Sequence, residues 1–117
     1  MTIEIWHYPR CSKSRKTLAL LEERGLEPTI RRYLDDPPDA QTIERVLEML
    51  DMEPRELMRP KEAPYTVLGL ADETTSREDL ISAMVEHPIL IQRPVVIVGD
   101  KAALGRPPEN VLSLLSD

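Results

Sequence analysis

Near its N-terminal end the chain reads Trp6-His7-Tyr8-Pro9-Arg10-Cys11-Ser12-Lys13-Ser14-Arg15-Lys16-Thr17, and this stretch decides the fold. It contains Cys11, the only cysteine of the chain, and four basic residues within seven positions. In the residues just before it, Ile3 and Ile5 alternate with other side chains, which predicts a short β-strand. Pro9 is expected to end this strand because it has no backbone N–H for the hydrogen-bond ladder.

The residues after Cys11 are predicted to form an α-helix that Ser12 or Ser14 caps and Gly25 stops. Cys11 then lies on a strand-to-helix turn, at or just before the helix N-terminus. Free N–H groups and the positive end of the helix dipole favour a thiolate there. In such settings a thiol pKa of about 8.5 falls to about 3.5–7.5. We therefore expect Cys11 to be a nucleophile.

The alternative interpretation is that Cys11 is a small buried hydrophobic residue, which is the commoner role of a lone cysteine. The basic residues Arg10, Lys13 and Arg15 on the same turn favour the nucleophile instead. His7 also has two interpretations. It could orient or activate the thiol, or it could close the strand with a satisfied imidazole.

Composition limits the class of protein. The 117 residues are predicted to form one domain, 1–117, with a core that needs no disulfide bond. One cysteine excludes an internal disulfide framework, and together with two scattered histidines it gives no expectation of a metal site. No apolar run has the length of a membrane span and no signal peptide is recognisable, so a cytoplasmic protein without a membrane partner is expected.

The charged residues indicate which partners to expect. A net charge of −6 argues against nucleic acid as the main partner. Of the 15 basic residues, 11 are arginines, whose planar fork of donors suits tetrahedral oxyanions and carboxylates. An arginine cluster near the thiol could form an anion pocket. The alternative is that most of the arginines make surface ion pairs, which contribute little.

The remaining chain alternates strand and helix patterns. Strands are predicted over residues 28–34, 95–98 and 101–104, and helices over 39–50, 54–59, 76–86 and from about 105 onwards, with a loop over 61–75. The order is β-α-β, a helical block, then β-β-α. This predicts an α/β thioredoxin-like fold with a mixed sheet and a helical insertion. In such a sheet Cys11 and Arg93-Pro94 would be neighbours.

Several segments carry a resemblance to a known family. They are His7–Leu18, Tyr33-Leu34-Asp35-Asp36-Pro37-Pro38, Pro64-Tyr65, Gly105-Arg106-Pro107 and, most specifically, His87-Pro88-Ile89-Leu90-Ile91-Gln92-Arg93-Pro94-Val95-Val96. Together they resemble the glutaredoxin-dependent arsenate reductases of the ArsC family, over essentially the whole chain in one register, and point to a YfgD-like member. The family fold is thioredoxin-like with a helical insertion.

The resemblance implies a set of site residues. Cys11 matches the nucleophile that attacks arsenic, and Arg59, Arg93 and Arg106 match the arginines that hold arsenate and its adduct. Ser14, His7 and Arg15 match polar substrate-site positions near the thiolate. Pro94 matches the proline beside the substrate, and the resemblance implies a cis bond between Arg93 and Pro94.

A single cysteine cannot resolve a covalent arsenic adduct within the chain, so an external thiol is expected. The resemblance identifies it as glutathione, a co-substrate, followed by glutaredoxin, with arsenate or a similar oxyanion as substrate and no tightly bound cofactor.

Three other functions are compatible with parts of this pattern. A related family member could act on another oxyanion. A Spx-like transcriptional regulator shares the fold but typically carries a Cys-x-x-Cys switch, which Cys11-Ser12-Lys13-Ser14 cannot form. A monothiol glutaredoxin-like carrier would need Cys-x-x-Ser but not three arginines converging on the thiol.

Overall fold

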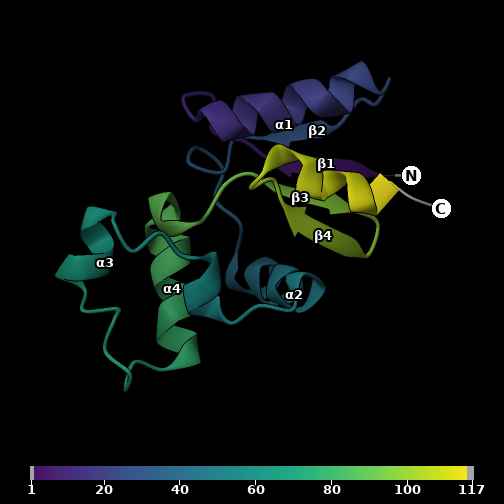
Figure 1. Ribbon diagram of the computed structural model, residues 1–117. Helices are drawn as coiled ribbons and strands as arrows, with labels where there is room; N and C mark the ends of the chain where they lie inside the picture. The colour runs from purple at the N-terminus through teal and green to yellow at the C-terminus, as the bar shows by residue number, and fades with distance from the viewer. Residues whose placement is uncertain (1, 116–117) are drawn as a thin grey trace. The chain divides into compact units, whose positions relative to one another are not determined.

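The computed structural model describes residues 2–115 and divides the chain into two compact units (Figure 1). The first runs to Asp36 and resumes at Arg93, and the second spans Pro37–Gln92. The prediction of a single domain over residues 1–117 stays a prediction.

The first unit is built on a four-stranded sheet with the order β2-β1-β3-β4. Its strands are β1 (Ile3–Trp6), β2 (Thr29–Arg31), β3 (Val95–Val98) and β4 (Lys101–Leu104). β1 pairs in parallel with β2 and antiparallel with β3, and β3 pairs antiparallel with β4. The predicted α/β class and mixed sheet are confirmed.

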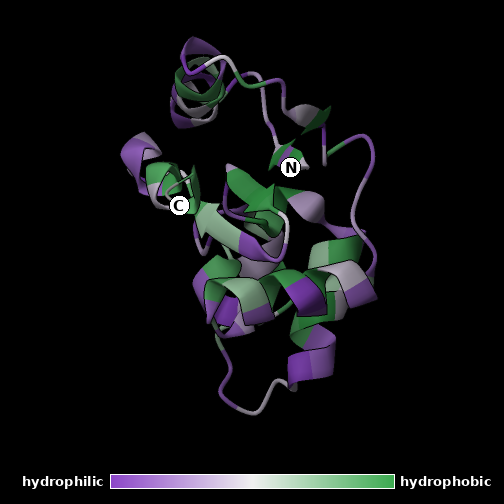
Figure 2. Ribbon diagram, turned by 90° about the vertical axis from the view of Figure 1, so that its right-hand side faces the viewer, coloured by the Kyte–Doolittle hydropathy of each residue, from purple (hydrophilic) through white to green (hydrophobic). Residues whose placement is uncertain are grey.

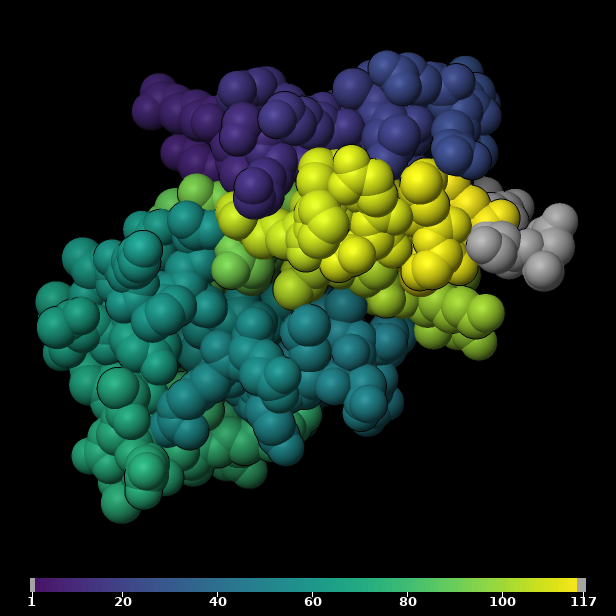
Figure 3. Space-filling model, viewed as in Figure 1, coloured from purple at the N-terminus to yellow at the C-terminus, as the bar shows by residue number. Residues whose placement is uncertain are grey.

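One face of this sheet carries the core of the first unit. The helix α1 (Ser12–Glu23) and the 3₁₀ helix η3 (Pro108–Leu115) both pack on that face, and they contact each other (Figure 3). The buried residues of this cluster are Ile3, Ile5, Leu21, Val96, Val98 and Val111. In the hydropathy-coloured ribbon the apolar strand β3, with the sequence Val95-Val96-Ile97-Val98, is green (Figure 2). Alternation in β1 produces this arrangement, since Ile3 and Ile5 point to the same face of the sheet.

Three predictions for this unit need correction. The second strand is limited to Thr29–Arg31 rather than residues 28–34. The N-cap of α1 is Cys11 itself rather than Ser12 or Ser14. The final element is a 3₁₀ helix, beginning only at Pro108. β2 ends at Arg31 because a turn follows it, in which the N–H groups of Asp35 and Asp36 both donate to Arg32 C=O at 2.9 Å. The Pro107-Pro108 pair delays the last helix, since proline is accepted only in a first helical turn.

The second unit is helical. It contains α2 (Ala40–Leu50), η1 (Pro54–Leu57), α3 (Ala63–Val67), α4 (Arg77–Glu86) and η2 (Pro88–Leu90). α4 contacts α2, η1 and η2. Two predicted helix starts are confirmed, because Asp39 accepts a hydrogen bond from Thr42 N–H at 2.8 Å and Ser76 accepts one from Asp79 N–H at 3.1 Å.

The predicted loop over residues 61–75 is partly wrong, because it contains α3. This five-residue helix buries none of its own residues, and Val67 is 79% exposed. It therefore lacks the apolar periodicity from which a helix is recognised.

Among residues 2–115, no helix combines the length and the apolar character that crossing a membrane requires.

Gly105 lies where three segments of the first unit approach one another closely. A Cβ atom at this position would lie 2.7 Å from Pro94 Cγ and closer still to Thr17 Oγ1 on α1. The Gly105 N–H donates to Pro94 C=O at 2.9 Å, which joins the segment after β4 to the segment before β3. Only glycine allows this approach without displacing α1 or Pro94.

The substitution Gly105→Ala should therefore lower the free energy of unfolding by about 1–3 kcal/mol, the usual cost of overpacking. Urea unfolding at equilibrium measures this change, and Lys101→Ala, an exposed substitution on β4, should change it by less than about 0.5 kcal/mol. Equal stability of the Gly105→Ala variant and the wild type would show that the site can accept a Cβ atom beside Thr17 and Pro94 at no cost.

Candidate active site

Cys11 is the N-cap of α1 and has extended backbone, with φ −91° and ψ 121°. Its C=O accepts the first hydrogen bond of the helix from Arg15 N–H at 3.0 Å, and its N–H donates to Tyr8 C=O at 3.0 Å. Backbone hydrogen bonds before and after Cys11 therefore fix the turn between β1 and α1. The half-buried thiol stands where the unpaired N–H groups of a first helical turn converge.

Ser14 ties this turn together from inside the helix. Its side chain is fully buried, and Oγ accepts a hydrogen bond from Tyr8 N–H at 3.1 Å. The same oxygen is 2.6 Å from Nδ1 of the buried His7. Which of the two groups donates depends on the histidine tautomer. His7, Tyr8 and Ser14 form one hydrogen-bonded anchor for the segment that carries Cys11.

The surroundings of Cys11 favour its thiolate. Burial, the largest single influence, by itself raises the pKa of the thiol. The N–H groups of Ser14 and Lys13 and the guanidinium of Arg93 act in the opposite direction, and together they lower the pKa of Cys11 below its ordinary value. The lowered pKa agrees with the sequence prediction, and it makes the thiol a better nucleophile near neutral pH.

His7 is predominantly uncharged near neutral pH. Burial is the main cause that lowers its pKa, and the positive charges of Arg32 and Arg15 lower it further. A neutral imidazole can share a hydrogen bond with Ser14 without bringing another charge beside the thiol.

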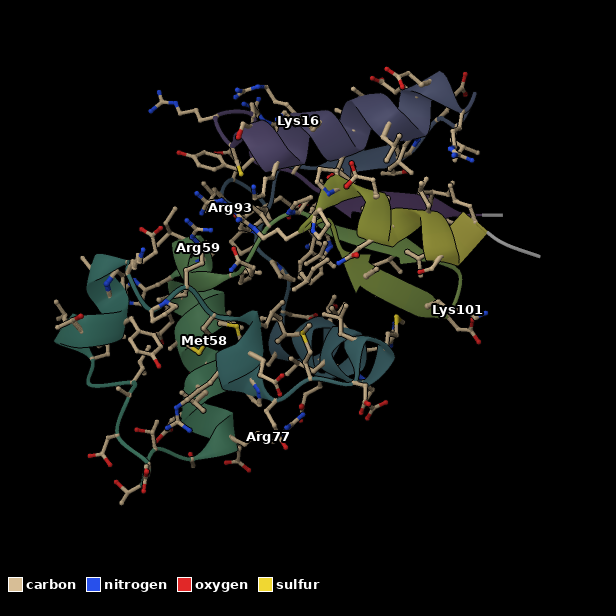
Figure 4. The ribbon with its side chains drawn as sticks, viewed as in Figure 1. Lys16, Met58, Arg59, Arg77, Arg93 and Lys101 are labelled. Atoms are coloured by element: carbon tan, nitrogen blue, oxygen red, sulfur yellow. The ribbon has the colours of Figure 1, made fainter. Side chains whose placement is uncertain are left out.

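Two arginines from the C-terminal half of the chain reach the thiol. Arg106 Nη2 is 3.7 Å from Cys11 Sγ, and Arg106 Nε donates to Arg93 C=O at 2.7 Å. Arg93 is buried, lies at the end of α1 that bears Cys11 and stacks its guanidinium over Tyr8, 4.8 Å from the ring centre (Figure 4). The first unit therefore places two guanidinium groups beside one thiolate.

Two further predicted residues belong to the same unit. Pro94 is buried and follows Arg93 through a cis peptide bond, which confirms the expected isomer. A second cis bond, Arg106-Pro107, was not predicted. Arg15 is exposed and its Nη1 donates to Pro9 C=O at 2.8 Å, so it braces the loop before Cys11.

Arg59 belongs to the second unit and follows Met58, the C-cap of η1 (Figure 4). Its Nε pairs with Glu62 at 3.1 Å, and its Nη1 donates to Gln92 Oε1 at 2.6 Å. These contacts hold the guanidinium beside Gln92, the residue that precedes Arg93 in the chain. Participation of Arg59 in a site with Cys11 stays a prediction.

Sequence reasoning did not identify two contributors. Tyr8 supplies the ring under Arg93 and the carbonyl that receives the Cys11 N–H, and Gly105 allows Pro94 to approach α1. The stacking of Arg93 on Tyr8 and the close approach at Gly105 have no signal in local spacing, because both join segments that are distant in sequence. Within the described part of the chain, no group of three or more His, Cys, Asp or Glu side chains could hold a metal ion.

Comparison with known proteins shows similarity to one protein family. The model of the ArsC family matches residues 6–114. The uncharacterized protein YfgD of Escherichia coli (strain K12) is 52% identical over 114 residues, covering 97% of this chain and 96% of that protein. An arsenate reductase of Haemophilus influenzae is 44% identical and covers 98% of this chain and 100% of its own length.

Solved structures agree with this relationship. An arsenate reductase from Vibrio cholerae superposes with a TM-score of 0.94 and 46% sequence identity, covering 97% of each chain. The similarity therefore includes the β-α-β and β-β-α halves and the helical segment between them, as the sequence predicted.

The contacts of Ser14 predict how the reactivity of Cys11 depends on pH. A lowered pKa means that the alkylation rate, which follows the thiolate fraction, should have its midpoint below the value of about 8.5 for free cysteine. Ser14→Ala removes the anchor to Tyr8 and His7, so the first-turn N–H groups lose their alignment and the midpoint should rise. Rates with iodoacetamide across a pH series measure it.

Ser12→Ala is the matched control, because Ser12 is exposed and lies on the same helical turn. A wild-type midpoint at about 8.5 or above would contradict the activated thiolate. Equal midpoints for the two serine variants would instead contradict the anchoring role of Ser14.

Proposed function

The chain belongs to the ArsC family, and on this premise we propose that it reduces arsenate to arsenite with Cys11 as the nucleophile. One observation carries the proposal. The Cys11 thiol caps α1, with Arg106 Nη2 3.7 Å from its sulfur and Arg93 beside it. Relatives named arsenate reductase, such as that of Rhizobium meliloti at 43% identity over 117 residues, support the choice of substrate.

The residue types suit a reaction between two anions. Arsenate is a tetrahedral oxyanion, and it repels a thiolate unless its charge is neutralised. Arg93 and Arg106 supply fixed positive charge and N–H donors at the sulfur, where charge-assisted hydrogen bonds to oxyanions are strongest. The arginines therefore favour the thiolate and the incoming oxyanion at the same time.

In the first step the Cys11 thiolate attacks arsenic. A sulfur–arsenic bond forms, an arsenic–oxygen bond breaks, and hydroxide leaves and is protonated to water. Arsenic stays in the +5 state, so this step is substitution without electron transfer. Glutathione then displaces a second hydroxide through its own thiolate.

Reduction comes with the external thiols. The thiolate of glutaredoxin attacks the glutathione sulfur, a disulfide forms, and the electron pair of the arsenic–glutathione bond remains on arsenic, which becomes +3. Water then releases arsenite and restores the Cys11 thiol. Two thiols are oxidised for each arsenic reduced, and Cys11 is unchanged at the end. The cytoplasm, where glutathione keeps thiols reduced, is the compartment in which we place the protein.

The other predicted residues take binding roles in this proposal. Arg59, held by Glu62 and Gln92, is proposed as the third arginine of the oxyanion site. Pro94, which follows Arg93, and Arg15, which donates to Pro9 C=O, are proposed as further parts of the substrate site. Ser14 and His7 keep the Cys11 segment in place.

A second candidate is the same chemistry on another oxyanion. Guanidinium groups recognise charge and tetrahedral geometry, which do not by themselves select arsenic. The 52% identity to YfgD, an uncharacterized protein whose name states no substrate, is compatible with this second candidate. A Spx-like regulator or a monothiol carrier would not need guanidinium groups beside its thiol.

Activity is predicted to depend on Cys11. Purified protein with arsenate, glutathione, glutaredoxin, glutathione reductase and NADPH should consume NADPH, and Cys11→Ser should consume none above background. Ser12→Ala should retain most of the rate. Arsenate-dependent turnover by the Cys11→Ser variant would remove Cys11 from the mechanism, and absence of turnover in folded wild type would favour the other oxyanion.

Each of the three arginines should contribute to oxyanion binding. In a Cys11→Ser background, Arg59→Ala, Arg93→Ala and Arg106→Ala should each weaken arsenate binding by about 1.5–3 kcal/mol, as expected for hydrogen bonds to a charged group. Calorimetric titration measures the affinity, and circular dichroism checks folding. Arg24→Ala, at the opposite end of α1, is the control. Affinities equal to that control would contradict the assigned oxyanion site.

A further inference from the structure

A small pocket lies beside the Cys11 loop, and the steps proposed above assign no ligand to it. Its volume is about 180 Å³, and its walls are residues 7–10 together with Arg32, Leu34 and Asp35. All of these residues belong to the first unit. The pocket thus lies between the turn that carries the nucleophile and the segment that follows β2.

Charged side chains of both signs line the pocket. Arg10 and Arg32 are exposed cations, and Asp35 is an exposed carboxylate whose Oδ2 is 3.9 Å from Arg32 Nε. His7 also lines the pocket, and the positive charge of Arg32 is one of the causes, after burial, that lower the pKa of its imidazole. A ligand entering the pocket meets two cations and one anion.

These charges suit the γ-glutamyl end of glutathione, a reactant of the proposed cycle, because that end carries one carboxylate for the cations and the ammonium group for Asp35. Glutathione carries two carboxylates and one ammonium group, with a thiol between them. We propose that this pocket binds one end of glutathione, placing a carboxylate on Arg32 and Arg10 and leaving the thiol free to reach Cys11. This inference rests on the proposed function, because it assigns a place to the external thiol that the single cysteine requires.

The size of the pocket agrees with partial binding. Sites that enclose a whole small molecule usually measure about 300–1,000 Å³, and this pocket measures about 180 Å³. A tripeptide extends to about 10 Å, so one end can occupy the pocket while the thiol lies outside it. Arg10, on the pocket wall, directly precedes Cys11 in the chain.

Tyr8 connects the pocket with the thiol. It lines the pocket, its ring carries the Arg93 guanidinium at 4.8 Å, and its C=O receives the Cys11 N–H at 3.0 Å. Arg93 in turn stabilises the Cys11 thiolate. A ligand held against Tyr8 is therefore next to the group that surrounds the reacting sulfur.

The charged residues of the pocket are exposed, so binding should be weak and sensitive to salt. Exposed ion pairs each contribute about 0.2–1 kcal/mol, and their attraction is screened over about 8–10 Å at physiological salt. A dissociation constant in the millimolar range suits a co-substrate that is abundant and must leave after each turnover.

S-methylglutathione is the probe, because it has the charges of glutathione but no reactive thiol. An NMR titration of the wild type should shift backbone signals of residues 7–10 and 32–35. Arg32→Ala and Arg10→Ala should each weaken binding about two- to fivefold, and the double variant should weaken it more than either. Arg32→Lys should restore part of the affinity, and Arg24→Ala, the same charge change at the far end of α1, should leave it unchanged.

Several outcomes would overturn the inference. They are no binding of S-methylglutathione to the wild type, equal affinity in Arg32→Ala and Arg24→Ala, or signal changes that acetate reproduces at the same concentration. The proposed function fails separately. If S-methylglutathione binding depends on Arg32 but the protein does not reduce arsenate, the proposed function is wrong and the pocket assignment stands. If Cys11-dependent turnover is seen but binding does not depend on Arg32, the pocket assignment alone is wrong.

Discussion

The position of Cys11 as the N-cap of α1 is the constraint on which the rest of the site depends. It directs the sulfur toward the unpaired N–H groups of the first helical turn, so the backbone itself stabilises a thiolate. Keeping it there requires a fixed turn, which Ser14 supplies through its contacts with Tyr8 and His7. Burial raises the pKa of the Cys11 thiol, and the N–H groups of the turn together with Arg93 lower it by more.

The sheet brings the arginines to this turn. β1 pairs with β3, so the chain that enters β3 passes beside the chain that leaves β1. Arg93 precedes β3 and Arg106 follows β4, which places both near Cys11 although they are distant in sequence. Gly105 makes the approach of these segments to α1 sterically feasible. The contacts that stabilise this part of the fold therefore also determine the reactivity of Cys11.

The features predicted correctly from sequence are those with local causes. Alternating residues in β1, the apolar run of β3 and the helix starts at Asp39 and Ser76 depend on residues within a few positions, and each element formed where expected. Elements set by distant partners were predicted less well. Three-residue β2 depends on its pairing with β1, and α3 has no buried face that could mark it in the sequence. The stacking of Arg93 on Tyr8 joins residues far apart in the chain, so it was visible only in the structure.

The most direct test of the account is a single turnover without glutaredoxin, in which wild type is mixed with arsenate and glutathione and analysed by intact-mass and peptide mass spectrometry. Arsenic bound through sulfur to the Cys11 peptide, and discharged as arsenite when glutaredoxin is added, is the predicted result. Arsenate reduction without any arsenic on Cys11, or an adduct that persists in the Cys11→Ser variant, would contradict the central claim that this thiolate attacks arsenic.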